Sequence, residues 1–414
     1  MNDFPRFFRI RRHTDPPRIP DITAAVRAEL DAAGVRFQPG NRVAVAVGSR
    51  GIRNLAAIVR ETLSWLSEQG AQPFIVPAMG SHGGATAEGQ TAVLREYGVS
   101  EEALGVSVES SMEVIELPRG DLPVPVFFDK NAQVADATVV INRVKPHTSF
   151  HGVHESGLLK MLAIGLGKHR GAASLHRLGV AGLRDIMPKV AAQILRHGNV
   201  RLGLAIVENS HDDTMLVRAV PAAGISELDR ELLAVARAAM PSLPACDLDI
   251  LILDEIGKDI SGLGMDPSII GRLKIPGQPE PESPRIKIII VRALTAKSRG
   301  NAAGIGLADI ITRRVFEAVD LRATYENVLT STFLERAKIP LIAENDAEAL
   351  RFAAQAVGMP PLADARIVRV KNTLRLDEAW ISETLHSEVS RSEKVEMLGV
   401  VEPLFDETGL LTKL

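Results

Sequence analysis

The sequence predicts an α/β protein with two α/β domains, each built on an open, mostly parallel sheet. Short β-branched runs alternate with amphipathic stretches, which is typical of strand–helix–strand units. The 414 residues exceed one typical core, and a Pro-rich stretch at 275–284 interrupts the alternation. We therefore expect an N-terminal cofactor-binding domain at 1–270, a smaller domain at 271–390, and a tail at 391–414 that packs on the N-terminal domain. An active-site cleft is expected between the domains.

The expected elements follow from these runs in order. In the first domain, strands are expected at Arg42–Val47, Pro73–Pro77, Ala137–Ile141, Val200–Val207 and Leu248–Leu253. Helices are expected from the cap Asn54 to Gly70, at Glu88–Tyr97 and at Leu228–Ala239. In the second domain, strands are expected at Lys287–Val291 and Ala365–Val370, and helices at Ala308–Ala318, Ala347–Ala356 and Asp377–Val389.

The composition excludes several classes of function. Charged residues make up 24% of the chain and the formal net charge is -3, so the basic surface of a nucleic-acid binder is not expected. The single cysteine can form neither an intrachain disulfide nor a cysteine-held zinc or iron–sulfur site. The N-terminus does not match a signal peptide, and no apolar run is long enough for a membrane span, which predicts a cytoplasmic protein. The sequence does not determine the oligomeric state, and a homo-oligomer is one of the possible states.

Each of two loops that follow strands contains glycines and one side chain that can bind a ligand or transfer a proton. Ligands of open α/β sheets bind beyond the carboxyl ends of the strands, so these loops are the informative ones. Arg50, in Gly48–Gly51, can bind a carboxylate or phosphate through its forked guanidinium, or it is a surface arginine in a tight turn. His82, in Gly80–Gly84, can contact a ligand and titrate near neutral pH, or it is a turn histidine.

A third region, after Ala137–Ile141, is rich in histidine. Five of the ten histidines fall between His147 and His176, which is a density not typical of a solvated surface. Some of them, such as His151, His154 and His169, can be bystanders. The spacing of His147, His151 and His154 is also close to that of a metal-ligand set. A metal-dependent hydrolase that uses these three side chains therefore stays open as an alternative.

Several motifs in order resemble the lactate racemase family. The family pattern is a Pro-His, a Ser-Gly before a lysine, and a histidine 16 residues after that lysine. This chain matches it with Pro146-His147, Ser156-Gly157, Lys160 and His176. The Gly-Ser-His ending at His82 resembles the family's Gly-Thr-His loop, and Arg50 falls at the arginine of an Asp-x-Thr-Arg turn. The resemblance covers the N-terminal half, from strand Arg42–Val47 to just beyond His176.

The resemblance implies an isomerase, a racemase or epimerase of a lactate-like or larger 2-hydroxy acid. It implies reversible hydride transfer at Cα, and His82 and His147 match the acid/base pair on the two faces of the substrate. Side chains lack the electron sink that hydride removal needs, so a cofactor must carry that step. Two histidines can then serve both enantiomers, each as base in one direction and acid in the other. Arg50 matches an arginine near the substrate or cofactor.

The implied cofactor is a nickel-pincer nucleotide, a dithiolated pyridinium mononucleotide. Lys160 matches the lysine that can be joined to it through a thioamide, and Ser156 and Gly157 match the motif before that lysine. His176 matches the histidine that ligates nickel. A soft pincer with one imidazole suits square-planar nickel. The resemblance also implies partnership with the enzymes that synthesise the cofactor.

Three departures from the family pattern concern the substrate more than the chemistry. Val47 stands where the family has Asp, and Gly83 stands where it usually has a larger polar residue. The stretch from His147 to Lys160 is a few residues longer than in the family. The loss of the Asp at position 47 leaves open a second alternative, a non-catalytic carrier or binder of the pincer cofactor, or a member of the family that acts on something other than a hydroxy acid.

The second domain offers one further loop of interest. Residues 255–267 are rich in glycine and follow the strand Leu248–Leu253 directly. Lys258 in this loop is a candidate for holding the substrate carboxylate, and Asp266 is a further cleft candidate. The alternative is a glycine-rich hinge between the domains.

Overall fold

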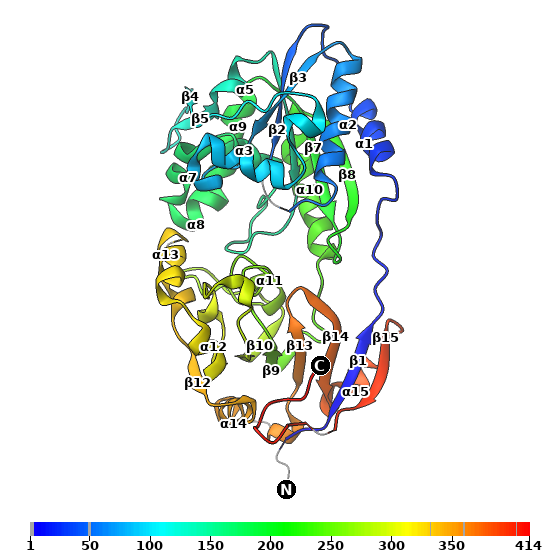
Figure 1. Ribbon diagram of the computed structural model, residues 1–414, viewed down its shortest axis with the longest axis vertical. Coiled ribbons are helices and arrows are strands. Elements are labelled where there is room, and N and C mark those ends of the chain that lie inside the picture. Colours follow the sequence, from blue (N-terminus) through cyan, green and yellow to red (C-terminus); the bar gives the residue numbers. More distant parts are fainter. Residues whose placement is uncertain (1–3, 49–50, 332, 359–360, 403) are drawn as a thin grey trace. The chain divides into compact units, whose positions relative to one another are not determined.

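The computed structural model describes residues 4–48, 51–331, 333–358, 361–402 and 404–414. The chain divides into two compact units, residues 16–240 and residues 1–15 with 241–414 (Figure 1). Both units are α/β, as predicted. The boundary differs from the expected one at 270, because the strand β9 (Asp247–Leu253) pairs with strands of the C-terminal unit. The expected cleft between the domains stays a prediction.

The unit of residues 16–240 contains a five-stranded sheet in the order β3-β2-β6-β7-β8. Its strands are β2 (Arg42–Val47), β3 (Gln72–Pro77), β6 (Ala137–Arg143), β7 (Val200–Glu208) and β8 (Thr214–Pro221), of which only β8 is antiparallel. The chain passes from β2 to β3 on one side and later to β6 on the other. The carboxyl ends of β2 and β6 therefore border a topological switch point, where ligands of such sheets bind.

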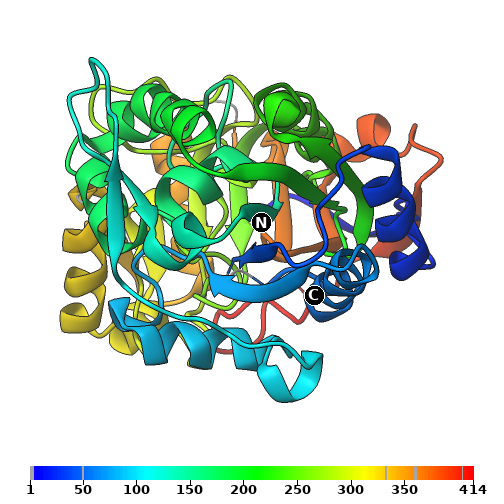
Figure 2. The same cartoon turned by 90° about the horizontal axis from the view of Figure 1, so that it is seen from above.

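Helices cover both faces of this sheet (Figure 2). The amphipathic helices α1 (Ile22–Ala32), α2 (Leu55–Glu68) and α3 (Ala87–Glu96) pack on one face, where Val45 and Leu204 are buried. Gly203 points to the other face, where a Cβ would meet Leu158 and Ile225 at 2.8 and 2.9 Å. That face carries α6 (Leu158–Lys160), the π-helical η2 (Met161–Gly165), α7 (Lys168–His176), α9 (Met187–His197) and α10 (Ile225–Ala239).

Shorter elements complete this unit. They are α4 (Glu101–Leu104), the hairpin of β4 (Val114–Leu117) and β5 (Val126–Asp129), α5 (Lys130–Val134), α8 (Gly179–Ala181) and the π-helical η3 (Gly182–Ile186). Asn54 precedes α2 with a left-handed φ of 62° and makes no side-chain cap. Its amide donates instead to Thr214 Oγ1 at 3.3 Å, so the expected cap is a link to β8.

The other unit contains an eight-stranded sheet in the order β12-β11-β10-β9-β13-β14-β1-β15. The strands from β12 to β13 are parallel, namely β12 (Leu341–Ala343), β11 (Ile310–Thr312), β10 (Arg285–Val291), β9 and β13 (Ile367–Asn372). The rest are antiparallel, namely β14 (Arg375–Ser382), β1 (Phe7–Arg12) and β15 (Val395–Val400). The C-terminal tail adds β15 beside β1 in this sheet and belongs to this unit, and its expected packing on the N-terminal domain stays a prediction.

Helices of this unit are α11 (Pro267–Ile270), α12 (Arg313–Ala318), α13 (Leu321–Ser331), α14 (Asp346–Val357) and α15 (Glu383–Val389). Two predicted helices are strands in their first part, since 308–318 begins with β11 and 377–389 lies partly in β14. Both segments find strand partners within the sheet, and this pairing overrides local amphipathicity. Among the described residues, none of the helices combines the length and apolar character that crossing a membrane requires.

Candidate functional site

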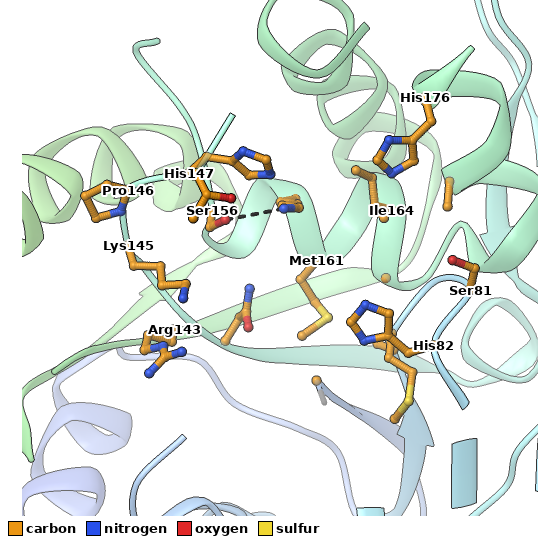
Figure 3. A pocket seen from close by; sticks show the side chains of 18 residues that line it. Ser81, His82, Arg143, Lys145, Pro146, His147, Ser156, Met161, Ile164 and His176 are labelled. Atoms are coloured by element: carbon orange, nitrogen blue, oxygen red, sulfur yellow. Dashed lines mark hydrogen bonds between the residues drawn. The ribbon is translucent and has the colours of Figure 1, made fainter. Parts of the chain in front are cut away.

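A cavity of about 300 Å³ opens at the carboxyl ends of β2, β3 and β6 (Figure 3). Three histidines reach it from different segments: His82 after β3, His147 after β6 and His176 at the end of α7. Lys160 and Ser156 also line it, so the structure brings together five of the predicted site residues. Its described lining residues carry cations and imidazoles but no carboxylate, which favours an anionic ligand.

The loop that carries His147 is held by the buried carboxylate of Glu155. Its Oε2 accepts from the main-chain N–H of His147 at 2.6 Å, while Oε1 accepts from the N–H of Gly152 at 3.0 Å and from Arg237 at 2.6 Å. Burial raises the pKa of Glu155, but the hydrogen bonds from His151 and from these groups outweigh it and hold that pKa below its ordinary value. The ionised carboxylate therefore anchors the loop.

The imidazole of His147 is itself fixed in orientation. Its Nδ1 accepts a hydrogen bond of 3.1 Å from the main-chain N–H of Ser149. The ring of Phe150 packs against it with centroids 4.5 Å apart. In the neutral ring, the hydrogen bond at Nδ1 leaves the proton on Nε2.

The first N–H groups of the helix that carries Lys160 donate to another buried carboxylate. Asp229 of α10 accepts from the N–H groups of Leu158 and Leu159 at 2.9 and 2.8 Å. A Cβ at Gly157 would lie 2.5 Å from Asp229 Oδ1, so only glycine lets this carboxylate approach. Gly157, expected at the cofactor, thus has a structural role at the start of α6. Burial raises the pKa of Asp229 to about 6, against the effect of the two hydrogen bonds.

Lys160 and His176 face the same cavity from α6 and α7. The ammonium of Lys160 donates to Ser156 Oγ at 3.4 Å (Figure 3). Burial, and then the positive charge of Lys160, lower the pKa of His176. The imidazole of His176 is therefore neutral near pH 7, which is the form that ligates metals.

The loop that carries His82 explains one departure from the family pattern. Gly83 has a left-handed φ of 64°, and a Cβ there would lie 2.5 Å from the main-chain carbon of Gly89. A larger residue cannot fit, because this turn packs on the start of α3. The turn of this chain is therefore built around glycine.

Several cavity residues were not among the predicted site residues. Asn142 and Arg143 at the end of β6, and Lys145 just after it, line the cavity beside His147. Arg143 forms an ion pair with Glu208. The signal that could have found them is the one that selected His147, namely polar side chains at the carboxyl end of a buried strand.

The alternative metal site at His147, His151 and His154 is not assembled. His154 Nε2 lies 3.0 Å from the carbonyl oxygen of Ser226, and His151 Nδ1 lies 3.3 Å from Glu155. Within the described ranges, no three His, Cys, Asp or Glu side chains form a group that could hold a metal ion. The hydrolase alternative therefore lacks the ligand set on which it depended.

The two predicted substrate-binding residues, Arg50 and Lys258, are not among the described residues that line the cavity. Arg50 lies outside the described residues. Lys258 belongs to the C-terminal unit, where its ammonium donates to the carbonyl of Gly262 at 2.6 Å and to Asn327 Oδ1 at 2.5 Å. Burial lowers the pKa of Lys258 to about 8. Asp266 caps α11 by accepting from the N–H two residues later.

The chain has a lactate racemase-like fold. It matches the lactate racemase apoprotein from Thermoanaerobacterium thermosaccharolyticum with a TM-score of 0.50 and 14% sequence identity, over 89% of this chain and 99% of that chain. A protein from Thermotoga maritima matches with a TM-score of 0.46 and 15% identity, over 68% of this chain and 71% of that chain. No family model and no curated protein matches the sequence. The resemblance predicted from the motifs is confirmed at the level of the fold.

Proposed function

We propose that this protein is a racemase or epimerase of a lactate-like or larger 2-hydroxy acid, and that it works with a nickel-pincer nucleotide. The observation that carries the proposal is the convergence of His82, His147, Lys160 and His176 on one cavity. These residues are the ones whose order and spacing resemble the lactate racemase motifs. The lactate racemase-like fold supports the same assignment.

The residues of the cavity fit the proposed cofactor. His176 would ligate nickel through its neutral imidazole, and Lys160 would attach the nucleotide through its amine, with Ser156 beside it. A soft pincer of carbon and sulfur donors would need one protein ligand, which the single imidazole of His176 would supply. Lys145 would supply a cation suited to the phosphate of a nucleotide, beside Arg143, whose charge is shared with Glu208.

The side chains would move the proton of the substrate hydroxyl. When bound, the nickel-pincer nucleotide supplies an electron sink that accepts a hydride from Cα and returns it to either face. His82 and His147 point into the cavity from separate loops (Figure 3), so one can take the hydroxyl proton and the other can return one. With its Nδ1 bonded to the N–H of Ser149, the neutral imidazole of His147 holds its proton on Nε2. To take the hydroxyl proton as a base, or to return one as an imidazolium, His147 must release this hydrogen bond.

Anchoring of the substrate carboxylate is proposed for Arg50, whose guanidinium suits a carboxylate. Lys258 stays a candidate anion-binding residue of its own unit, because a lysine with a pKa of about 8 is largely cationic at neutral pH. The cofactor-synthesis enzymes are the proposed partners, and the cytoplasm is the proposed location.

A deuterium-transfer experiment tests the proposal. The protein is produced together with the cofactor-synthesis enzymes, its nickel and intact mass are measured, and single enantiomers of several 2-hydroxy acids labelled with deuterium at Cα are supplied. The opposite enantiomer should form with most of the deuterium retained, because a hydride does not exchange with water. Complete exchange with solvent in the first turnovers would indicate proton abstraction and overturn the mechanism. A loaded protein that turns over none of the hydroxy acids would favour the non-catalytic cofactor binder.

A further inference from the structure

A fully buried lysine, Lys168, lies outside the cavity at the start of α7, the helix that ends at His176. The ammonium of Lys168 donates to the main-chain oxygen of Pro77 at 2.5 Å and to Gln90 Oε1 at 3.2 Å. It lies 3.0 Å from Asp129 Oδ2, and both side chains of this ion pair are completely buried. Burial of charge is costly compared with an apolar core, so this arrangement requires an explanation.

The position of Lys168 in the chain connects it with the cavity. Its φ of 54° is left-handed, which is uncommon for a residue other than glycine. Lys168 is the first residue of α7 and follows η2, which ends at Gly165, so it lies in the chain between Lys160 and His176. The ammonium reaches the end of β3, three residues before Gly80 and the loop of His82. Lys168 therefore joins the start of α7, the helix that ends at His176, to the end of β3, which leads into the loop of His82.

Gln90 of α3 extends this contact to the loop of His82. It is fully buried, and its Nε2 donates to the carbonyl oxygens of Gly80 at 2.9 Å and His82 at 3.4 Å. An ammonium can only donate hydrogen bonds, so Lys168 requires the oxygen of the Gln90 amide to face it. The NH₂ group must then face the loop. The ammonium on one side of Gln90 and the two carbonyl oxygens on the other therefore select the same orientation of its amide.

We propose that Lys168 and Gln90 are positioning residues of the active site. Lys168 orients the amide of Gln90, and Gln90 holds the main chain at Gly80 and His82, so that the imidazole of His82 keeps its place relative to α7 and His176. Asp129 neutralises the buried ammonium and also caps α5 through the N–H of Ala132 at 2.8 Å. The catalytic meaning of this arrangement rests on the proposed function, whereas the positioning itself can be measured without substrate or cofactor.

The sharpest variant is Gln90→Glu. A carboxylate still accepts from Lys168, so the ammonium stays paired, but it cannot donate to the carbonyl oxygens of Gly80 and His82. Gln90→Met removes both parts of the amide without adding a charge. The matched control is Gln133→Met on α5, because Gln133 Oε1 is also buried and, among the described residues, accepts no hydrogen bond.

In ligand-free protein, amide hydrogen exchange of residues 79–86 should become about tenfold faster in both Gln90 variants, because each variant loses the hydrogen bonds from Nε2 to the carbonyl oxygens of Gly80 and His82. The imidazole NMR signal of His82 should shift or broaden. In loaded protein, kcat should fall by roughly 10²-fold, the effect of a small misplacement of a reacting group, with a smaller change in KM. Gln133→Met should leave the exchange of this segment, the His82 signal and kcat unchanged.

Two results separate the claims. If both Gln90 variants match Gln133→Met in the exchange of residues 79–86 and in the His82 signal, the positioning role is wrong. If these signals change as expected while the loaded wild-type protein turns over no 2-hydroxy acid, the positioning role stands and the proposed function fails. A double variant, Lys168→Met with Asp129→Asn, removes both charges and keeps an acceptor for the α5 cap. It should loosen the same segment, and an unchanged segment would show that the ammonium does not orient Gln90.

Discussion

The main-chain N–H of His147 donates a hydrogen bond of 2.6 Å to the carboxylate of Glu155. The same carboxylate accepts from Arg237 on α10, so a proposed acid/base residue is tied to a helix far along the chain. Glu155 lies in the stretch between His147 and Lys160 that is longer than in the lactate racemase family. The longer loop therefore contains its own anchor.

Glu155→Gln should loosen this loop. The amide lacks the charge that strengthens the bonds from Arg237 and the two N–H groups, so we expect a loss of roughly 1–3 kcal/mol of stability. The pKa of Glu155 is held below its ordinary value in the folded protein. Its stabilising contribution is therefore present above about pH 4.5 and is lost as the pH falls through the lower, folded-state pKa. Urea unfolding should show the difference between wild type and variant shrinking at acid pH. The exposed Glu96→Gln serves as control, and an equal loss there would contradict a specific anchor.

Asp229 should affect stability in the opposite direction. Burial raises its pKa from 3.8 to about 6, so the folded protein keeps a proton that the unfolded chain releases. The contribution of this group to the free energy of unfolding therefore falls as the pH rises from 3.8 to about 6, by roughly 3 kcal/mol. Asp229→Asn cannot titrate and should lack this component. Urea unfolding across that pH range checks it, and parallel curves for the two proteins would refute the raised pKa.

Substitutions of the two proposed cofactor residues should have different effects on the bound cofactor. His176→Ala removes the only protein ligand assigned to nickel, so the purified protein should lose the metal. Lys160→Ala removes the amine and should lose any covalent addition to the chain. Metal analysis and intact-mass spectrometry of protein made with the cofactor-synthesis enzymes measure both. Stoichiometric nickel and full activity in both variants would show that the assignment of these positions is wrong.

The acid/base pair should behave differently from the cofactor residues. His82→Ala and His147→Ala should each slow turnover by roughly 10²–10⁴-fold, the usual contribution of a positioned acid or base. Nickel content should stay near that of the wild type, because neither residue is assigned to the metal. Both directions of the reaction should slow in each variant, since each histidine acts in both, and the equilibrium constant must stay the same. Values of kcat/KM measured from each pure enantiomer test this, and a variant that keeps the wild-type kcat/KM in both directions would show that its histidine is not the acid/base residue.

Local pattern was sufficient for much of this protein. The β-branched run at Arg42–Val47 is a strand with those bounds, and Leu248–Leu253 is extended by only one residue. The rule that ligands bind after parallel strands selected His82 and His147, because side-chain period and strand direction are encoded within short segments. The spacing of Lys160 and His176 was visible for the same reason, since both lie within one short stretch of chain.

Tertiary structure alone decided which strands share a sheet and what holds the site. β9 pairs with β10 and β13, so the boundary between the two units lies at residue 240 and not at the expected residue 270. β1, from the N-terminus, lies between β14 and β15 of the same sheet. The contacts of Glu155 with Arg237, and of Lys168 with Gln90, join residues 82 and 78 positions apart. No local period signals such contacts. They form because burying an unpaired charge is costly, and the partner that lowers this cost can come from any part of the chain that packs beside it.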